Sequence, residues 1–103
     1  MSLYTGGERR RSGRIDAKRP VLITSLDAES LRPVTAFTFT LSQFGCAVRC
    51  LTSVAPGTRV LLECEGKKMP GKVTFVLKSS ALEGYEIGIA FDSDGSEFWG
   101  ETF

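Results

Sequence analysis

The sequence predicts an all-β domain, a six-stranded antiparallel barrel that follows a flexible basic N-terminal arm. Three observations lead to this fold class. Apolar and polar residues alternate with a period of two, in short runs rich in β-branched and aromatic side chains. Turn-forming residues separate the runs, and no ten-residue stretch shows helical periodicity with caps. Closure into a barrel would remove the exposed edges that an open sheet of short strands leaves.

Size and composition bound the class of protein. With 103 residues the chain is long enough for one domain at most, and a hydrophobic fraction of 42% can form one modest core. It has no apolar run of about eighteen residues and no segment typical of a secretion signal, so we expect a cytoplasmic protein without a membrane partner. An odd number of cysteines fits a reducing compartment. We expect Cys46, Cys50 and Cys64 to be buried apolar thiols.

Residues 1–19 are predicted to form the arm, because they have little apolar content and no periodicity. They carry six basic and two acidic residues, a net charge of +4, whereas the remaining 84 residues carry a net charge of −3. The arm ends at Arg19-Pro20, since proline disfavours helical conformation in the residue before it. A basic arm on a mildly acidic body indicates a local anion site and argues against a broad nucleic-acid surface.

Strand patterning begins after the arm. Six runs show it, over residues 21–26, 34–41, 46–50, 59–64, 73–77 and 85–91. Turn signals lie between them, at residues 27–30, 43–45, 55–57, 65–68 and 83–84. The end of the chain has two open interpretations, a short helical turn around Phe98 and Trp99 or the start of a longer helix. The predicted division is an arm over residues 1–19, a barrel over 20–92 and a tail over 93–103.

The second strand run is expected to have an apolar and a polar face. If Phe37, Phe39 and Leu41 face the core, the alternate residues point outward. These outward residues would form a small polar ladder, Thr38, Thr40 and Ser42. The ladder would lead into a glycine turn at Gly45, and Arg49 on the next strand would point outward and could lie beside it.

The sequence argues against an enzyme and against a metal site. It contains no histidine, which is the commonest general base. It has neither the GxSxG nucleophile motif nor the phosphate-binding GxxxxGK[ST] loop. Zinc would need a fourth ligand beside the three cysteines, and no CxxC spacing is present. We therefore expect a binding protein that uses neither a metal nor a cofactor.

The main chemical signal is a pair of arginines four residues apart on the arm, Arg10 and Arg14. A guanidinium group is permanently charged and planar, so it suits phosphate oxygens and the O6/N7 edge of guanine, and it stacks on bases. Gly13 between them permits a tight turn that lets both side chains converge on one ligand. Taken alone, such a pair is also typical of a solvated basic tail.

Three segments together resemble PilZ domains, which bind the bacterial messenger cyclic di-GMP. They are ERRRSGR at residues 8–14, TLSQFGCAV at 40–48 and GYEIGIAF at 84–91. The resemblance implies a six-stranded antiparallel barrel of the PilZ-like, split-barrel type. It also implies an RxxxR motif on the arm and a [D/N]xSxxG motif on the barrel surface. Cyclic di-GMP, often as an intercalated pair, would be held between the two motifs.

The resemblance assigns roles to individual residues. Arg10 and Arg14 would clamp guanine edges and phosphates. Ser42 would hydrogen-bond the ligand, and Gly45 would supply the turn conformation. Thr40 stands where the family has Asp or Asn. Threonine offers a single hydroxyl, whereas the carboxylate of Asp or the amide of Asn can make a two-point contact with guanine. Losing one such contact costs about 1–3 kcal/mol. The complete predicted ligand-binding set is Arg9, Arg10, Arg14, Thr40, Ser42, Gly45 and Arg49, with added charge from Arg11.

Three functions remain open on the sequence. The first is a small cytoplasmic receptor module that binds cyclic di-GMP and signals to a protein effector as the arm becomes ordered over the barrel. The second, motivated by Thr40, is a degenerate PilZ domain that no longer binds the nucleotide and acts as a protein-interaction module. The third is a barrel that binds nucleic acid through its arm, which the acidic body and the lack of an exposed aromatic array disfavour.

Overall fold

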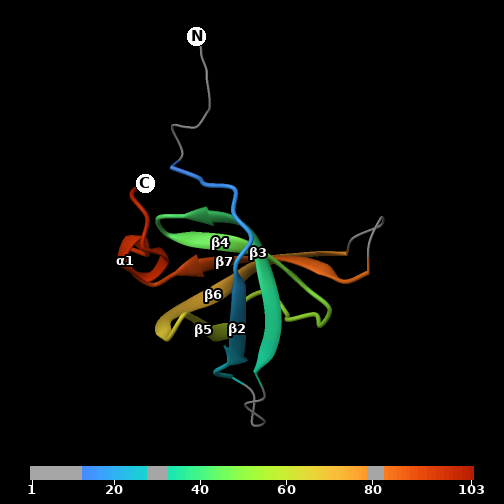
Figure 1. The fold of residues 1–103 in the computed structure, drawn as a ribbon. Coiled ribbons are helices and arrows are strands. Elements are labelled where there is room, and N and C mark those ends of the chain that lie inside the picture. The colour runs from blue at the N-terminus through green and yellow to red at the C-terminus, as the bar shows by residue number, and fades with distance from the viewer. Residues whose placement is uncertain (1–12, 28–32, 79–82) are drawn as a thin grey trace.

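Residues 13–27, 33–78 and 83–103 are described by a computed structural model. Within them, six antiparallel strands close into a barrel in the order β2-β3-β4-β7-β6-β5, as Figure 1 shows. The elements are β2 (Pro20–Ser25), β3 (Val34–Ser42), β4 (Gly45–Cys50), β5 (Arg59–Cys64), β6 (Lys67–Lys78), β7 (Tyr85–Phe91) and α1 (Ser96–Trp99). This confirms the predicted fold class. In the described part of the chain, no helix has the length and apolarity needed to cross a membrane.

Five strands agree with the predicted runs to within one residue, and the exception is β6, which begins at Lys67. Glu65 and Gly66 form the whole turn between β5 and β6, with left-handed φ angles of 52° and 81°. Two-residue turns of this kind match the twist of the flanking strands. Pro70 does not interrupt β6, because its carbonyl faces β7 and accepts a hydrogen bond from the Asp92 amide at 3.0 Å. The N–H that proline lacks would also face β7, so the hydrogen bonds between β6 and β5 are kept.

The faces of β3 differ from the prediction because the strand contains a β-bulge. Between Thr38 and Thr40 the register with β4 shifts by one residue, and Phe39 is the extra residue. A bulge of this kind reverses the alternation of inward and outward side chains. The prediction that Phe37 and Phe39 face the core was therefore wrong, and so was the outward placement of Thr38, which is buried. Leu41 follows the bulge and faces the core as predicted.

The barrel interior is filled by apolar side chains from all six strands. The least exposed are Leu41, Val48, Val60, Leu62 and Ile87. Cys46, Cys50 and Cys64 are buried free thiols, as predicted. Burial, with a smaller contribution from Cys64, raises the pKa of Cys46 well above the ordinary thiol value, so this group stays protonated and acts as a small apolar side chain.

The helix α1 packs against the core at one end of the barrel. Phe98 and Trp99 are buried, and their ring centroids lie 5.6 and 5.7 Å from that of Phe91 in β7. This confirms the interpretation of the tail as a short helical turn around these two aromatic residues. Gly100 adopts a left-handed conformation with φ of 69° and ends the helix, so the alternative of a longer helix is not realised.

Candidate functional site

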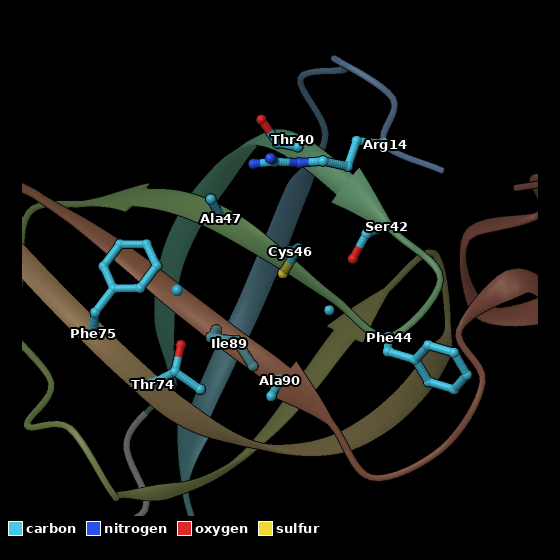
Figure 2. A pocket seen from close by; sticks show the side chains of 12 residues that line it. Arg14, Thr40, Ser42, Phe44, Cys46, Ala47, Thr74, Phe75, Ile89 and Ala90 are labelled. Carbon is cyan, nitrogen blue, oxygen red and sulfur yellow. The ribbon is translucent and has the colours of Figure 1, made fainter. Parts of the chain in front are cut away.

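An open pocket on the outer surface of the barrel gathers residues from the arm and from β3, β4, β6 and β7. Its volume is about 350 Å³, and Figure 2 shows the side chains around it. Four members of the predicted binding set line it: Arg14, Thr40, Ser42 and Gly45. The other lining residues are Phe44, Cys46, Ala47, Thr74, Phe75, Gly88, Ile89 and Ala90.

The arm delivers Arg14 to the rim of this pocket. Immediately after it, Ile15 forms two backbone hydrogen bonds with β3, of 2.9 and 2.7 Å. Immediately before it, Gly13 has a left-handed φ of 63° and lies against Phe103 at the end of the tail. Between these two fixed neighbours the Arg14 side chain extends toward Thr40, as Figure 2 shows. The chain direction at Gly13 thus places the guanidinium over the barrel surface.

Two hydroxyl groups of β3 lie beside Arg14. The bulge at Phe39 sets Thr40 outward, and Ser42, two residues further on, lies on the same face of the strand. Both side chains are half-buried and line the pocket. A hydroxyl group donates one hydrogen bond and accepts two, so the pair can serve phosphate oxygens or the edge of a base.

Gly45 is required by a close approach of two strands. A side chain at this position would place its Cβ 2.3 Å from the carbonyl oxygen of Ile89. Gly45 does not adopt a left-handed φ, so the structure gives it a different role from the turn conformation that the resemblance implied. It pairs with Ala90, and next to them Ala47 pairs with Gly88. These four small residues form a flat floor for the pocket.

Two aromatic rings stand at the margin of this floor. Phe44 is exposed in the turn between β3 and β4. A second bulge, at Thr74, turns Phe75 outward, and its ring lies over Gly88, where an added Cβ would come within 2.1 Å of it. Sequence reasoning missed both rings, because Phe44 belongs to a turn signal and Phe75 to an alternating run, where an aromatic residue is normally assigned to the core. The expected lack of exposed aromatic residues was therefore wrong. The available signal was the small outward-facing pair Gly88 and Ala90 on the neighbouring strand.

The pocket can bind an anion that also has a planar apolar surface. Among the described residues that line it, Arg14 alone is charged, so no carboxylate opposes an anion there. The flat floor and the exposed rings of Phe44 and Phe75 can contact a planar group. In the described ranges, no group of three or more His, Cys, Asp or Glu side chains could hold a metal ion.

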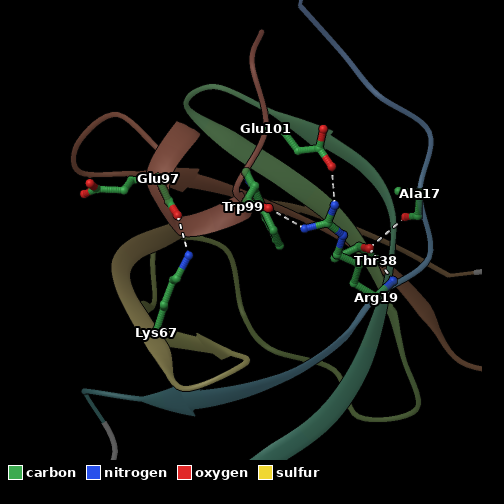
Figure 3. A network of polar contacts seen from close by, with 7 residues as sticks. All are labelled: Ala17, Arg19, Thr38, Lys67, Glu97, Trp99 and Glu101. Atoms are coloured by element: carbon green, nitrogen blue, oxygen red, sulfur yellow. Dashed lines mark hydrogen bonds and ion pairs between the residues drawn. The ribbon is translucent and has the colours of Figure 1, made fainter.

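The part of the arm that leads into β2 is tied to both the barrel and the tail, as Figure 3 shows. The Thr38 hydroxyl donates to the Ala17 carbonyl at 2.8 Å and accepts from the Arg19 amide at 2.9 Å. The Arg19 guanidinium donates to the Trp99 carbonyl at 2.5 Å and forms an ion pair with Glu101. The sequence predicted a flexible arm throughout 1–19, whereas residues 13–19 are held in place by these contacts.

Replacing the buried Thr38 with valine is expected to lower the free energy of unfolding by about 1–3 kcal/mol. The Arg19 amide and the Ala17 carbonyl would each lose their hydrogen bond to its hydroxyl. Urea unfolding followed by circular dichroism measures the change. Thr35→Val, at an exposed position on the same strand, is the matched control and should differ little from the parent. Equal stability of the two variants would contradict a role for this contact.

The remaining predicted residues are not gathered in this pocket. Arg49 points outward, as predicted, but it pairs with Glu86 at 3.2 Å and its guanidinium lies 5.7 Å from the centroid of the Phe39 ring. It lines a second recess, of about 610 Å³, further along the same face. Arg9 and Arg10 lie outside the described residues, as does Arg11.

The structure of the Bacillus subtilis inhibitor of motility MotI/DgrA, a PilZ-domain protein, is similar to this barrel, with a TM-score of 0.66. The barrel has a PilZ-like fold. The match covers 90% of this chain at 16% sequence identity, and the chain spans about half the length of MotI/DgrA, at 47%. No protein-family model matches the sequence, and a search of curated proteins found no match. The PilZ-like fold thus confirms the family resemblance at the level of architecture.

Proposed function

We propose that this chain is a small cytoplasmic module that binds cyclic di-GMP between its arginine arm and the barrel surface and performs no catalysis. One observation carries the proposal: a single pocket collects Arg14 of the RxxxR motif with Thr40, Ser42 and Gly45 of the second motif. These two segments are separate in the sequence, and the resemblance places the ligand between them. The PilZ-like fold supports the same arrangement.

The chemistry of the pocket matches the two parts of the nucleotide. Arg14 offers charge-assisted hydrogen bonds to a phosphate or to the O6/N7 edge of guanine. Thr40 and Ser42 offer hydroxyl groups next to it. The small residues of the floor admit a flat base, and Phe75 presents an aromatic ring at its margin. Arg10 would clamp the ligand together with Arg14, and Arg9 and Arg11 would add positive charge from the same arm.

Signalling is proposed to pass through the arm to a protein effector. Arg14 is adjacent to Gly13, which lies against Phe103 of the tail, and Arg19 connects the same arm to Glu101. A ligand that holds Arg14 would stabilise the arm and the tail together. An effector would therefore recognise the ligand-bound state at the surface formed by the arm and the tail.

Isothermal titration of the chain with cyclic di-GMP at moderate salt is the direct test. We expect saturable heat with the guanine nucleotide and much weaker binding of cyclic di-AMP. The adenine analogue has the same phosphate backbone, but it lacks the guanine O6 acceptor. An absence of saturable heat at high micromolar nucleotide would overturn the proposal.

Replacing Thr40 with aspartate is expected to tighten the binding of cyclic di-GMP about tenfold to a hundredfold. The carboxylate would accept two hydrogen bonds from the guanine edge where the threonine hydroxyl makes one contact. Titration calorimetry measures the change. The matched control is Thr74→Asp, which adds the same charge at another position of the same pocket and should weaken binding by repelling phosphate. Equal effects of the two substitutions would contradict a specific role for position 40.

The same residue supports a second candidate function, a degenerate PilZ domain that acts as a protein-interaction module. Thr40 is half-buried and lines the pocket, but it lacks the acid or amide that the resemblance places at this position. In that case the parent chain would give no saturable heat, and Thr40→Asp would acquire binding. Measurable binding by the parent at physiological nucleotide levels decides in favour of the receptor.

A further inference from the structure

The outer face of the barrel carries large exposed apolar side chains beside the nucleotide pocket. They come from β3, from β6 and from the residue that follows β4, and we call this surface the apolar face: Phe37, Phe39, Leu51, Phe75 and Leu77. Phe37 is 43% exposed and Leu77 is 54% exposed. In a closed barrel, apolar side chains of this size usually point into the interior. Two bulges direct the rings of Phe39 and Phe75 outward. These residues form two groups on either side of β4 and β7, and exposed apolar groups of this size mark interaction surfaces more often than single residues do.

A row of four residues crosses the middle of this face, with one residue from each of four adjacent strands. Phe37 of β3 pairs with Arg49 of β4, Arg49 pairs with Glu86 of β7, and Glu86 pairs with Leu77 of β6. The order across the sheet is therefore apolar, positive, negative, apolar. Arg49 and Glu86 lie 3.2 Å apart and both remain about one-third exposed, so each can accept a second partner.

When a second copy of this row is turned end to end and placed over the first, the facing residues are complementary. A two-fold axis parallel to the strands, between β4 and β7, places the partner's Leu77 over Phe37 and the partner's Glu86 over Arg49. Apolar groups then meet apolar groups, and each charge meets its opposite. Such an isologous arrangement, in which the same patch serves both subunits, is the commonest symmetry of protein oligomers. We infer that the apolar face is the interface of a homodimer with this symmetry.

The shape of the face supports the same occupant. The second recess, of about 610 Å³, is lined by Phe37, Phe39 and Leu51, with the charged residues Lys18 and Glu83 also in its wall. The Lys18 ammonium lies 5.0 Å from the centroid of the Phe37 ring, and the axis directs the partner's Leu77 to the edge of this recess. The face contains aromatic residues and an arginine, which are residue types enriched in protein–protein interfaces. A partner of one net charge would leave either Arg49 or Glu86 opposed by a like charge, whereas a second copy satisfies both.

Charge exchange tests this symmetry. Arg49→Glu should place two acids opposite two acids across the interface, and Glu86→Arg should place two bases opposite two bases. Each variant alone is expected to dimerise at least about tenfold more weakly than the parent. Mixed together, the two variants should form a heterodimer, because the acids of one subunit then face the bases of the other. The double variant Arg49→Glu/Glu86→Arg should dimerise like the parent.

Sedimentation velocity over a range of protein concentrations, without nucleotide, measures these equilibria. The matched control is Arg59→Glu, which breaks the exposed pair between Arg59 and Asp92 at 2.8 Å on another part of the barrel and should leave dimerisation unchanged. Circular dichroism confirms that each variant is folded. A parent that stays monomeric at every concentration, or single variants that dimerise as well as the parent, would overturn the inference. Because nucleotide is absent, these results are independent of the proposed ligand.

Discussion

Replacing Arg14 with alanine is expected to lower the affinity of the module for cyclic di-GMP about a hundredfold. Arg14 is the only charged residue among the described residues lining the pocket, and its guanidinium extends over the barrel toward Thr40. A charge-assisted, two-point contact with phosphate or guanine is among the stronger polar interactions, and alanine removes both its charge and its geometry. Titration calorimetry at constant salt measures the loss.

Two further variants separate the origins of this effect. Arg14→Lys keeps the charge but loses the planar fork, so an intermediate affinity is expected. Arg59→Ala removes an exposed arginine from β5, outside the pocket, and should bind like the parent. If Arg14→Ala bound the nucleotide as well as Arg59→Ala does, the pocket would not be the ligand site.

Replacing Trp99 with alanine is expected to lower the free energy of unfolding by about 3–5 kcal/mol. Trp99 is 3% exposed and packs with Phe91 and Phe98 at the end of the core. Its indole N–H is buried without a hydrogen-bond partner in the described structure, so its contribution comes from packing. A small domain has few such side chains, and the loss of one leaves a cavity that the barrel cannot close without moving strands.

Urea unfolding followed by far-ultraviolet circular dichroism measures this loss without relying on the removed fluorophore, since Trp99 is the single tryptophan of the chain. Phe44→Ala is the control, because it removes an aromatic ring that is 57% exposed. It should change stability by less than about 0.5 kcal/mol. Similar losses in the two variants would contradict the placement of Trp99 in the core.

Most of the fold was predictable because its strands follow a strict two-residue period. Five of the six strands were placed to within one residue on this signal alone. The first part of β6 was missed because Lys67 and Lys68 look like a turn and because Pro70 normally argues against a central strand. A strand accepts Pro70 only if the side that lacks the N–H does not need it for pairing, and this depends on which strand lies on that side.

The candidate site was predictable only in part. The two motifs indicated Arg14, Thr40, Ser42 and Gly45, and the structure brings these four into one pocket. The floor and the rings were not predictable, because Phe75 belongs to an alternating run whose phase a bulge reverses. Arg49 was assigned to the ligand, yet it lies by Glu86 beside a different recess.

The sequence by itself determined the class of fold and the buried state of the cysteines, because these depend on local composition and alternation. The resemblance to PilZ domains indicated the residues of the two motifs. Only the tertiary structure decided which face each side chain takes, since the bulges at Phe39 and Thr74 arise from mismatched register between neighbouring strands. It also decided why Gly45 is needed, because the obstruction is the carbonyl of Ile89 on a strand far along the chain. Contacts between strands, which no single segment encodes, thus shape the pocket and the apolar face.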